Sequence, residues 1–288
     1  MYRGEKVYTV VGFGQECLTF AQPALIFPEE TQRSLMSQTK PKINTTRLVL
    51  TKIREGDYLH AGEEEAIDMV LKKVLTLDRK LPAKAALDVG SGLGGTANYF
   101  YQQGFKDIQG IDLDPAAIAY TKVKYPHISF TESNALELDK LYPSPSFSLI
   151  YLFNVIYAIQ DKATLIKKLS ALTVQNGILV LFDYAEGKRR TDFPIIDKEN
   201  TAIYPLQIDD IKKDLDAAGW KIIDINDLTQ NYIVWYQGLV RKINNPSSQV
   251  VSEFSQAELS QVNKMYSYLL DLLEKGDLGG VVIYATKK

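Results

Sequence analysis

Two apolar runs in this chain contain acidic residues, and a series of glycines follows the first run. The first run, 85–89, contains Asp88 and leads into Gly90, Gly92 and Gly94. The second run, 108–112, ends in Asp112. Glycines let a backbone approach a ligand closely, and an acid at the tip of the second strand can accept hydrogen bonds from ribose hydroxyls. The pattern therefore predicts a strand, a glycine turn, a helix and a second strand around a nucleoside cofactor.

The position of the first acid distinguishes between two classes of cofactor. Dinucleotide sites have glycines spaced G-x-G-x-x-G and hold a pyrophosphate at a helix N-terminus. Here Asp88 precedes Gly90, Gly92 and Gly94 at alternate positions, and a carboxylate would repel a pyrophosphate. S-adenosylmethionine carries a sulfonium and an ammonium and has no phosphate, so the sequence favours this cofactor.

Strand and helix patterns alternate through most of the chain. The first clear helix is predicted at 63–77, where apolar residues recur at helical spacing. Further helices are predicted at 94–103, 115–124, 161–173 and 208–218, and strands at 85–89, 108–112, 128–131, 148–153, 177–183, 221–225 and 280–286. This alternation indicates an α/β fold: a seven-stranded, mostly parallel, doubly wound (Rossmann-like) sheet with helices on both faces.

Two segments extend this α/β unit. Residues 227–275 are predicted to form two helices around the polar link 244–248, inserted between the last two strands. Insertions of this size above a cofactor site are often lids, although a packing or dimerisation element is the alternative. Residues 1–45 are interpreted as an N-terminal arm that covers part of the main domain, 46–288, with a functional segment as the alternative.

Composition excludes several other classes of protein. The chain has 288 residues and a net charge of −2, so no basic surface indicates nucleic-acid binding. The single Cys17 cannot form an internal disulfide, and with only two histidines we expect no metal site. No apolar run is long enough to span a membrane. We expect a cytoplasmic protein whose partner is a small molecule, and the sequence does not indicate an oligomeric state.

The sequence resembles class I S-adenosylmethionine-dependent methyltransferases, and within them phosphoethanolamine N-methyltransferases. The resemblance runs from about residue 50 to about 240 and resumes in the last strand. The segments that carry it are 56–62, 87–95, 110–112, 149–151, 182–184 and 284–287.

The resemblance implies a role for each residue around the cofactor. Gly90 and Gly92 would lie against its methionine and ribose parts, with Asp88 near the methionine end. Asp112 would accept hydrogen bonds from the ribose hydroxyls, and Leu113 would pack on the adenine. The full set of implied cofactor residues is Leu59, His60, Asp88, Gly90, Ser91, Gly92, Asp112, Leu113, Asn134, Ala135 and Phe153.

The roles of Asn134 and His60 depend on the chemistry of their side chains. Asn134 replaces an aspartate that usually accepts from the adenine amino group, and an amide oxygen can still accept there. His60 has three interpretations: a cofactor neighbour, a general base, or a polar residue that merely flanks a helix. If the reaction uses a base, His60 is the catalytic candidate.

The chain departs from the subfamily where its members bind their substrate. The Tyr–His pair is missing: Ala158 stands at the histidine position, and no tyrosine occurs between Tyr8 and Tyr58. Asn154 replaces a carboxylate, and the phosphate-binding arginine position falls near Ala202. A buried phosphate without a cationic partner is costly, which argues against phosphoethanolamine itself. The residues expected to contact substrate are Asn154, Tyr184 and Tyr204.

The sequence therefore predicts an enzyme, an S-adenosylmethionine-dependent methyltransferase that releases S-adenosylhomocysteine. Its acceptor is expected to be a small molecule, with an amine nitrogen slightly favoured. Two alternatives stay open: an O-methyltransferase of a small metabolite, and a non-catalytic protein that binds S-adenosylmethionine.

Overall fold

The computed structural model describes residues 43–142, 144–189, 193–196 and 202–288. Nearly all of the arm predicted for residues 1–45, including Cys17, lies outside these described residues.

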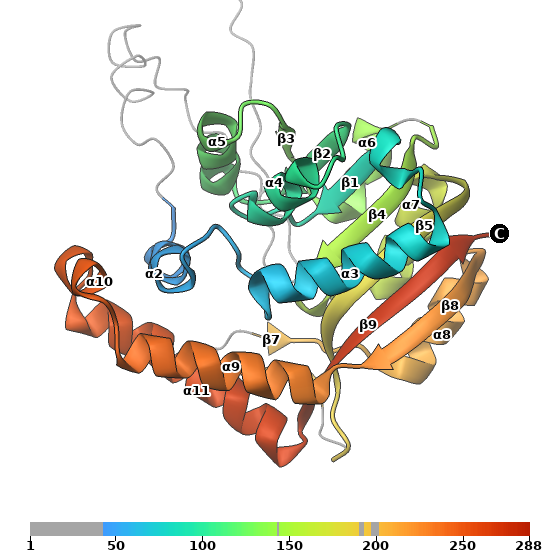
Figure 1. Ribbon diagram of the computed structural model, residues 1–288. Helices are drawn as coiled ribbons and strands as arrows, with labels where there is room; N and C mark the ends of the chain where they lie inside the picture. The colour runs from blue at the N-terminus through green and yellow to red at the C-terminus, as the bar shows by residue number, and fades with distance from the viewer. Residues whose placement is uncertain (1–42, 143, 190–192, 197–201) are drawn as a thin grey trace, which may run out of the picture. The chain divides into compact units, whose positions relative to one another are not determined.

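The main sheet has seven strands in the order β3-β2-β1-β4-β5-β9-β8 (Figure 1). Their bounds are β1 Ala86–Val89, β2 Ile108–Asp112, β3 Ser129–Glu132, β4 Phe147–Phe153, β5 Thr173–Glu186, β8 Trp220–Asp227 and β9 Leu278–Lys287. All neighbouring pairs are parallel except those of β9, which runs antiparallel to β5 and β8. The predicted seven-stranded, mostly parallel sheet is confirmed.

Helices cover both faces of this sheet (Figure 1). The first face carries α3 (Glu63–Leu77), α4 (Gly95–Gln102) and α5 (Pro115–Lys124). The second face carries α6 (Leu138–Leu141), α7 (Lys162–Leu172) and α8 (Ile208–Ala217). Successive side chains of a strand point to opposite faces. In β4, accordingly, Leu149 and Tyr151 belong to the first core, and Ile150 and Leu152 to the second.

Local sequence signals set several helix ends. Pro115 is the first residue of α5, where its missing N–H is not needed, and the Asp114 side chain accepts from the Ala116 N–H. Gly219 follows α8 with a φ of +81°, a left-handed conformation that terminates helices.

Three helices join β8 to β9, where the sequence indicated two. They are α9 (Thr229–Asn244), α10 (Ser248–Glu253) and α11 (Gln256–Lys275). The extra helix, α10, begins in the polar link because Ser247 caps it by accepting from the Val250 N–H. A capping box between Ser255 and Glu258 then starts α11. In the fold, α11 packs against α9 (Figure 1).

Some short elements were not predicted from the sequence. Helix α2 (Thr45–Arg54) precedes α3, contacts α11, and buries Val49, Leu50 and Ile53. Asn44 caps α2, and together with the helical spacing of those apolar residues it is the signal that could have revealed this helix. The remaining short elements are β6 (Ile195–Ile196), β7 (Ala202–Ile203), and the 3-10 helices η1 (Leu81–Ala83), η2 (Ala135–Glu137) and η3 (Ile156–Ala158).

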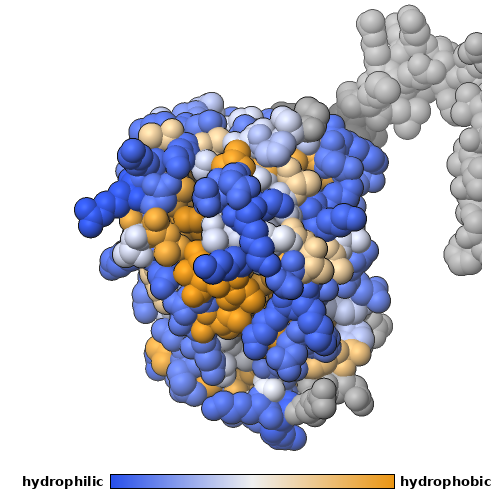
Figure 2. Space-filling view, turned by 90° about the vertical axis from the view of Figure 1, so that its right-hand side faces the viewer, coloured by the Kyte–Doolittle hydropathy of each residue, from blue (hydrophilic) through white to orange (hydrophobic). Residues whose placement is uncertain are grey.

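Strand β8 forms one edge of the sheet. On the side of the molecule where it lies, apolar side chains gather near the centre and hydrophilic ones surround them (Figure 2). On β8, Ile223 is 38 % exposed, while Asp224 pairs with Lys73 at 2.7 Å. Charged side chains on an edge strand discourage pairing with another chain.

Among the described residues, no helix combines the length and apolar character needed to cross a membrane.

Candidate functional site

A cavity of about 540 Å³ lies at the carboxyl ends of the parallel strands, where ligands bind in open α/β sheets. Twelve of the residues predicted for the site line it: Leu59, His60, Asp88, Gly90, Ser91, Gly92, Asp112, Leu113, Asn134, Ala135, Phe153 and Asn154. The structure therefore brings every predicted cofactor residue, and Asn154, to one cleft.

The glycine turn after β1 forms the floor of this cleft. Gly90 and Gly92 have φ angles of +75° and +52°, a region that favours glycine. A Cβ on Gly90 would lie 2.4 Å from Cγ2 of Val155, so a larger residue would collide with the loop after β4. The N–H groups of Gly90 and Ser91 both donate to the Ile111 carbonyl at 2.8 Å, which ties the turn to β2.

Asp112 stands at the tip of β2 with its carboxylate held in place. Its Oδ2 accepts from the Gly92 N–H at 2.8 Å, and its Oδ1 accepts from the Asp114 N–H at 2.9 Å. Each oxygen keeps a further lone pair, so the carboxylate can still accept from two ligand hydroxyls. Beside it, Leu113 is 68 % exposed and offers an apolar surface to a flat ring.

Asp88 and Ser91 supply buried polar atoms that lack a partner. Asp88 is 2 % exposed and Ser91 is 6 % exposed. Asp88 Oδ2 and Ser91 Oγ have no hydrogen-bond partner among the described residues. Burial raises the pKa of Asp88 well above its usual range, and the nearby charge of Asp112 raises it further. A cationic ligand in the cleft would stabilise the ionised form of Asp88.

The segment after β3 contributes Asn134 and Ala135. Asn134 Oδ1 accepts from the Leu136 N–H at 2.9 Å and so caps η2. The same oxygen has a second lone pair, and the side-chain amide can still donate.

His60 is buried, with both ring nitrogens hydrogen-bonded. Nδ1 lies 2.9 Å from the Ala61 carbonyl, which can only accept, so Nδ1 carries the proton. Nε2 then accepts from the Thr96 hydroxyl at 3.0 Å. Burial lowers the pKa of His60 to about 3. This environment favours a neutral His60 that supports the cleft over a His60 that takes protons from substrate.

The pH dependence of folding stability should report this neutral state. Unfolded histidine takes up a proton near pH 6.5, whereas folded His60 resists protonation down to about pH 3. Wild type should therefore lose stability relative to His60→Gln as the pH falls below 6.5, by about 1.4 kcal/mol per pH unit. Urea unfolding of both proteins at about pH 7.5 and about pH 5 measures the difference. Parallel pH curves would contradict the neutral assignment.

Asp183 fixes the loop that carries Asn154. Its Oδ2 accepts from the N–H groups of Val155 and Ile156, both at 2.7 Å, and its Oδ1 from that of Tyr184 at 2.7 Å. Burial raises the pKa of Asp183 to about 7, while these amide bonds favour its ionised form. The loop therefore leaves β4 in one fixed path. Sequence reasoning noted Asp183 only as part of the segment 182–184.

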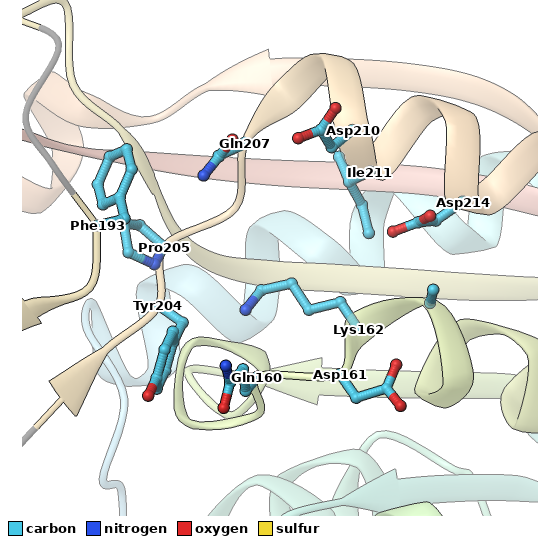
Figure 3. A pocket seen from close by; sticks show the side chains of 11 residues that line it. Gln160, Asp161, Lys162, Phe193, Tyr204, Pro205, Gln207, Asp210, Ile211 and Asp214 are labelled. Atoms are coloured by element: carbon cyan, nitrogen blue, oxygen red, sulfur yellow. The ribbon is translucent and has the colours of Figure 1, made fainter.

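The two predicted substrate tyrosines do not line the cleft, although both contact Tyr157 beside it. Tyr184 is 4 % exposed, and its hydroxyl pairs with that of Tyr236. Tyr204 borders a separate cavity of about 280 Å³, where its ring centre is 5.6 Å from Lys162 Nζ (Figure 3). Tyr157, in the loop after β4, is a tyrosine that does line the cleft.

Several other cleft residues come from segments that sequence reasoning did not assign to the site. Helix α2 supplies Thr46, Arg47 and Leu50, and α11 supplies Gln261 and Met265. Within the part of the chain that the structure describes, no three His, Cys, Asp or Glu residues are grouped so that they could hold a metal ion.

Comparisons with known proteins agree with this architecture. A family model described as a methyltransferase domain matches residues 58–225. The chain is 25 % identical over 240 residues to phosphoethanolamine N-methyltransferase 1 of Zea mays, a match that covers 81 % of this chain and 46 % of that protein. It is 25 % identical over 196 residues to phosphoethanolamine N-methyltransferase 3 of Arabidopsis thaliana, a match that covers 65 % of this chain and 38 % of that protein. This chain therefore spans less than half the length of these relatives.

The fold is shared with solved structures. One is a Haemonchus contortus phosphoethanolamine N-methyltransferase 2 in complex with phosphomonomethylethanolamine and S-adenosylhomocysteine. It superposes with a TM-score of 0.74 at 18 % identity, over 89 % of this chain and 60 % of that one.

Proposed function

The chain belongs to the methyltransferase-domain family, and on that premise we propose that it transfers the methyl group of S-adenosylmethionine to a small-molecule acceptor. The observation that carries this proposal is the single cleft containing Asp88, the glycine turn and Asp112. Its volume of about 540 Å³ is in the range of small-molecule sites.

The residues of the cleft fit S-adenosylmethionine. The unpartnered Asp88 Oδ2 and Ser91 Oγ can take the ammonium of its methionine part. The free lone pairs of Asp112 can take the two ribose hydroxyls, and exposed Leu113 can pack on the adenine. When bound, the cofactor supplies a methyl group already activated by its sulfonium.

The protein's own contribution is chiefly one of positioning. Methyl transfer needs the acceptor atom, the methyl carbon and the sulfur in line, and holding them so can provide much of the acceleration. The fixed glycine turn and the Asp183-bound loop contact each other at Gly90 and Val155, and both line the cleft. Neutral His60 supports the cleft wall. A base is needed only if the acceptor must lose a proton.

An amine nitrogen is slightly favoured as acceptor atom because the matched relatives are named as N-methyltransferases. Asn154 stands where the subfamily has a carboxylate to hold an ammonium, and an amide there can still orient a neutral amine. An oxygen acceptor is the alternative, and a protein that binds the cofactor without turnover is another.

The test combines binding and turnover in one preparation. S-adenosylmethionine and S-adenosylhomocysteine are titrated calorimetrically, and labelled-methyl transfer is measured on a panel of amines and phenols. We expect both ligands to bind and at least one acceptor class to be methylated. A folded protein that binds neither ligand would refute the proposal, and binding without turnover on any acceptor would favour the non-catalytic alternative.

A further inference from the structure

The Asn154 side chain has a defined orientation at the edge of the cleft. The Ala61 N–H, which can only donate, lies 3.0 Å from one side-chain atom of Asn154, so that atom must be Oδ1. The Tyr232 hydroxyl donates to the same oxygen at 3.4 Å. Both lone pairs of Oδ1 are thus used. Asn154 Nδ2 is buried and has no partner among the described residues.

The backbone around Asn154 opposes any reversal of this amide. Asn154 has a φ of +51°, and its N–H donates to the Phe182 carbonyl at 2.8 Å. The next two residues, Val155 and Ile156, are held by Asp183. A flipped amide would face its NH₂ group against the Ala61 N–H, leaving two donors together and no acceptor. Asn154 lines the cleft, and the one side-chain atom it leaves without a partner among the described residues is the donor Nδ2.

The cleft is also lined by three carboxylates, those of Asp57, Asp88 and Asp112, so the donor character is local to Asn154. Asp57 already accepts from the Tyr120 and Tyr125 hydroxyls, and Asp112 is held by two backbone amides at the cofactor end. Behind His60 lies Arg54, whose side chain is 1 % exposed and whose guanidinium stays charged in a protein.

The Arg54 guanidinium has one ion-pair partner and two nitrogens without a hydrogen-bond partner among the described residues. It donates to the His60 carbonyl and lies 3.3 Å from a carboxylate oxygen of Glu63. Its Nε and Nη2 have no partner within the described ranges. Its positive charge next to the cleft disfavours a second cation there.

We propose that the acceptor end of the cleft selects small molecules that bring a carboxylate or carbonyl oxygen to Asn154 Nδ2, and that it discriminates against an ammonium at this point. The proposal rests on the proposed function and deepens it. It makes Asn154 a specificity-determining residue. The acceptor then carries an oxygen group in addition to the atom that receives the methyl.

The test is a binding comparison on protein saturated with S-adenosylhomocysteine. Three probes share a benzyl body: phenylacetate, phenylacetamide and phenethylammonium. Phenylacetate and phenylacetamide can each accept a hydrogen bond from Asn154 Nδ2, whereas the ammonium of phenethylammonium would face this donor. The first two probes should therefore bind about 10-fold tighter than the third. In Asn154→Asp the preference should reverse towards phenethylammonium, a result that loss of structure alone would not produce.

Asn176→Asp is the matched control, since Asn176 also has a positive φ, of 61°, but is exposed and does not line the cleft. It should keep the wild-type order of affinities. Equal or tighter binding of phenethylammonium by wild type would overturn the proposal, as would the absence of binding by all three probes to a protein that binds S-adenosylhomocysteine. Failure to bind S-adenosylhomocysteine would instead refute the proposed function.

Discussion

Replacing Asp112 by alanine is expected to weaken binding of S-adenosylhomocysteine by about 100-fold or more. The carboxylate is held by the amides of Gly92 and Asp114 and can accept from two ribose hydroxyls. Hydrogen bonds to a charged group contribute about 1.5–3 kcal/mol each, and every 1.4 kcal/mol is about 10-fold in affinity. Calorimetric titration of both proteins measures the difference.

Glu132→Ala is the matched control for Asp112→Ala. Glu132 pairs with Asp112 in the register of β3 against β2, so it is an acid at the same edge of the sheet. It is exposed and does not line the cleft. We expect Glu132→Ala to bind as wild type does. If Asp112→Ala loses no more affinity than this control, the assignment of Asp112 to the ribose is wrong.

Replacing Asp183 by alanine is expected to destabilise the fold by about 3–9 kcal/mol, since unpaired buried amides cost about 1–3 kcal/mol each. The amides of Val155, Ile156 and Tyr184 would lose their Asp183 partner, and the Tyr157 amide would lose a longer contact of 3.4 Å. For a domain of this size the melting temperature should fall by about 6 °C or more. Because the loop also carries Asn154, probe binding at the acceptor end should weaken as well.

Two further variants isolate the cause of this effect. Asp161→Ala also removes a carboxylate that accepts from a backbone amide, that of Thr164 at the start of α7, but Asp161 is exposed. It should cost only about 1 kcal/mol, as helix caps do. Asp183→Asn keeps one acceptor oxygen and should fall between the two. A thermal scan showing Asp183→Ala no less stable than Asp161→Ala would contradict the role given to Asp183.

Much of the fold was predictable because its signals are local. The sheet followed from apolar runs alternating with helical periodicity, and Pro115 and Gly219 marked helix ends. Helix α10 and the extension of β5 to Thr173–Glu186 were harder to predict from the sequence. The reason is that a short helix depends on a single cap, and strand length depends on the neighbouring strands. β5 pairs with β9 from Ile178 to Glu186 and with β4 at Thr173.

The sequence alone predicted the residues of the proposed cofactor end of the cleft, because β1 and β2 place the glycine turn and Asp112 by chain connectivity. Only the tertiary structure decided which residues form the proposed acceptor end. It brought α2 and α11 to the cleft and left Tyr184 and Tyr204 outside it. It also buried His60 beside the Ala61 carbonyl, and it oriented the Asn154 amide so that its oxygen accepts from the Ala61 N–H. These features depend on contacts between residues far apart in the chain, which no local pattern encodes.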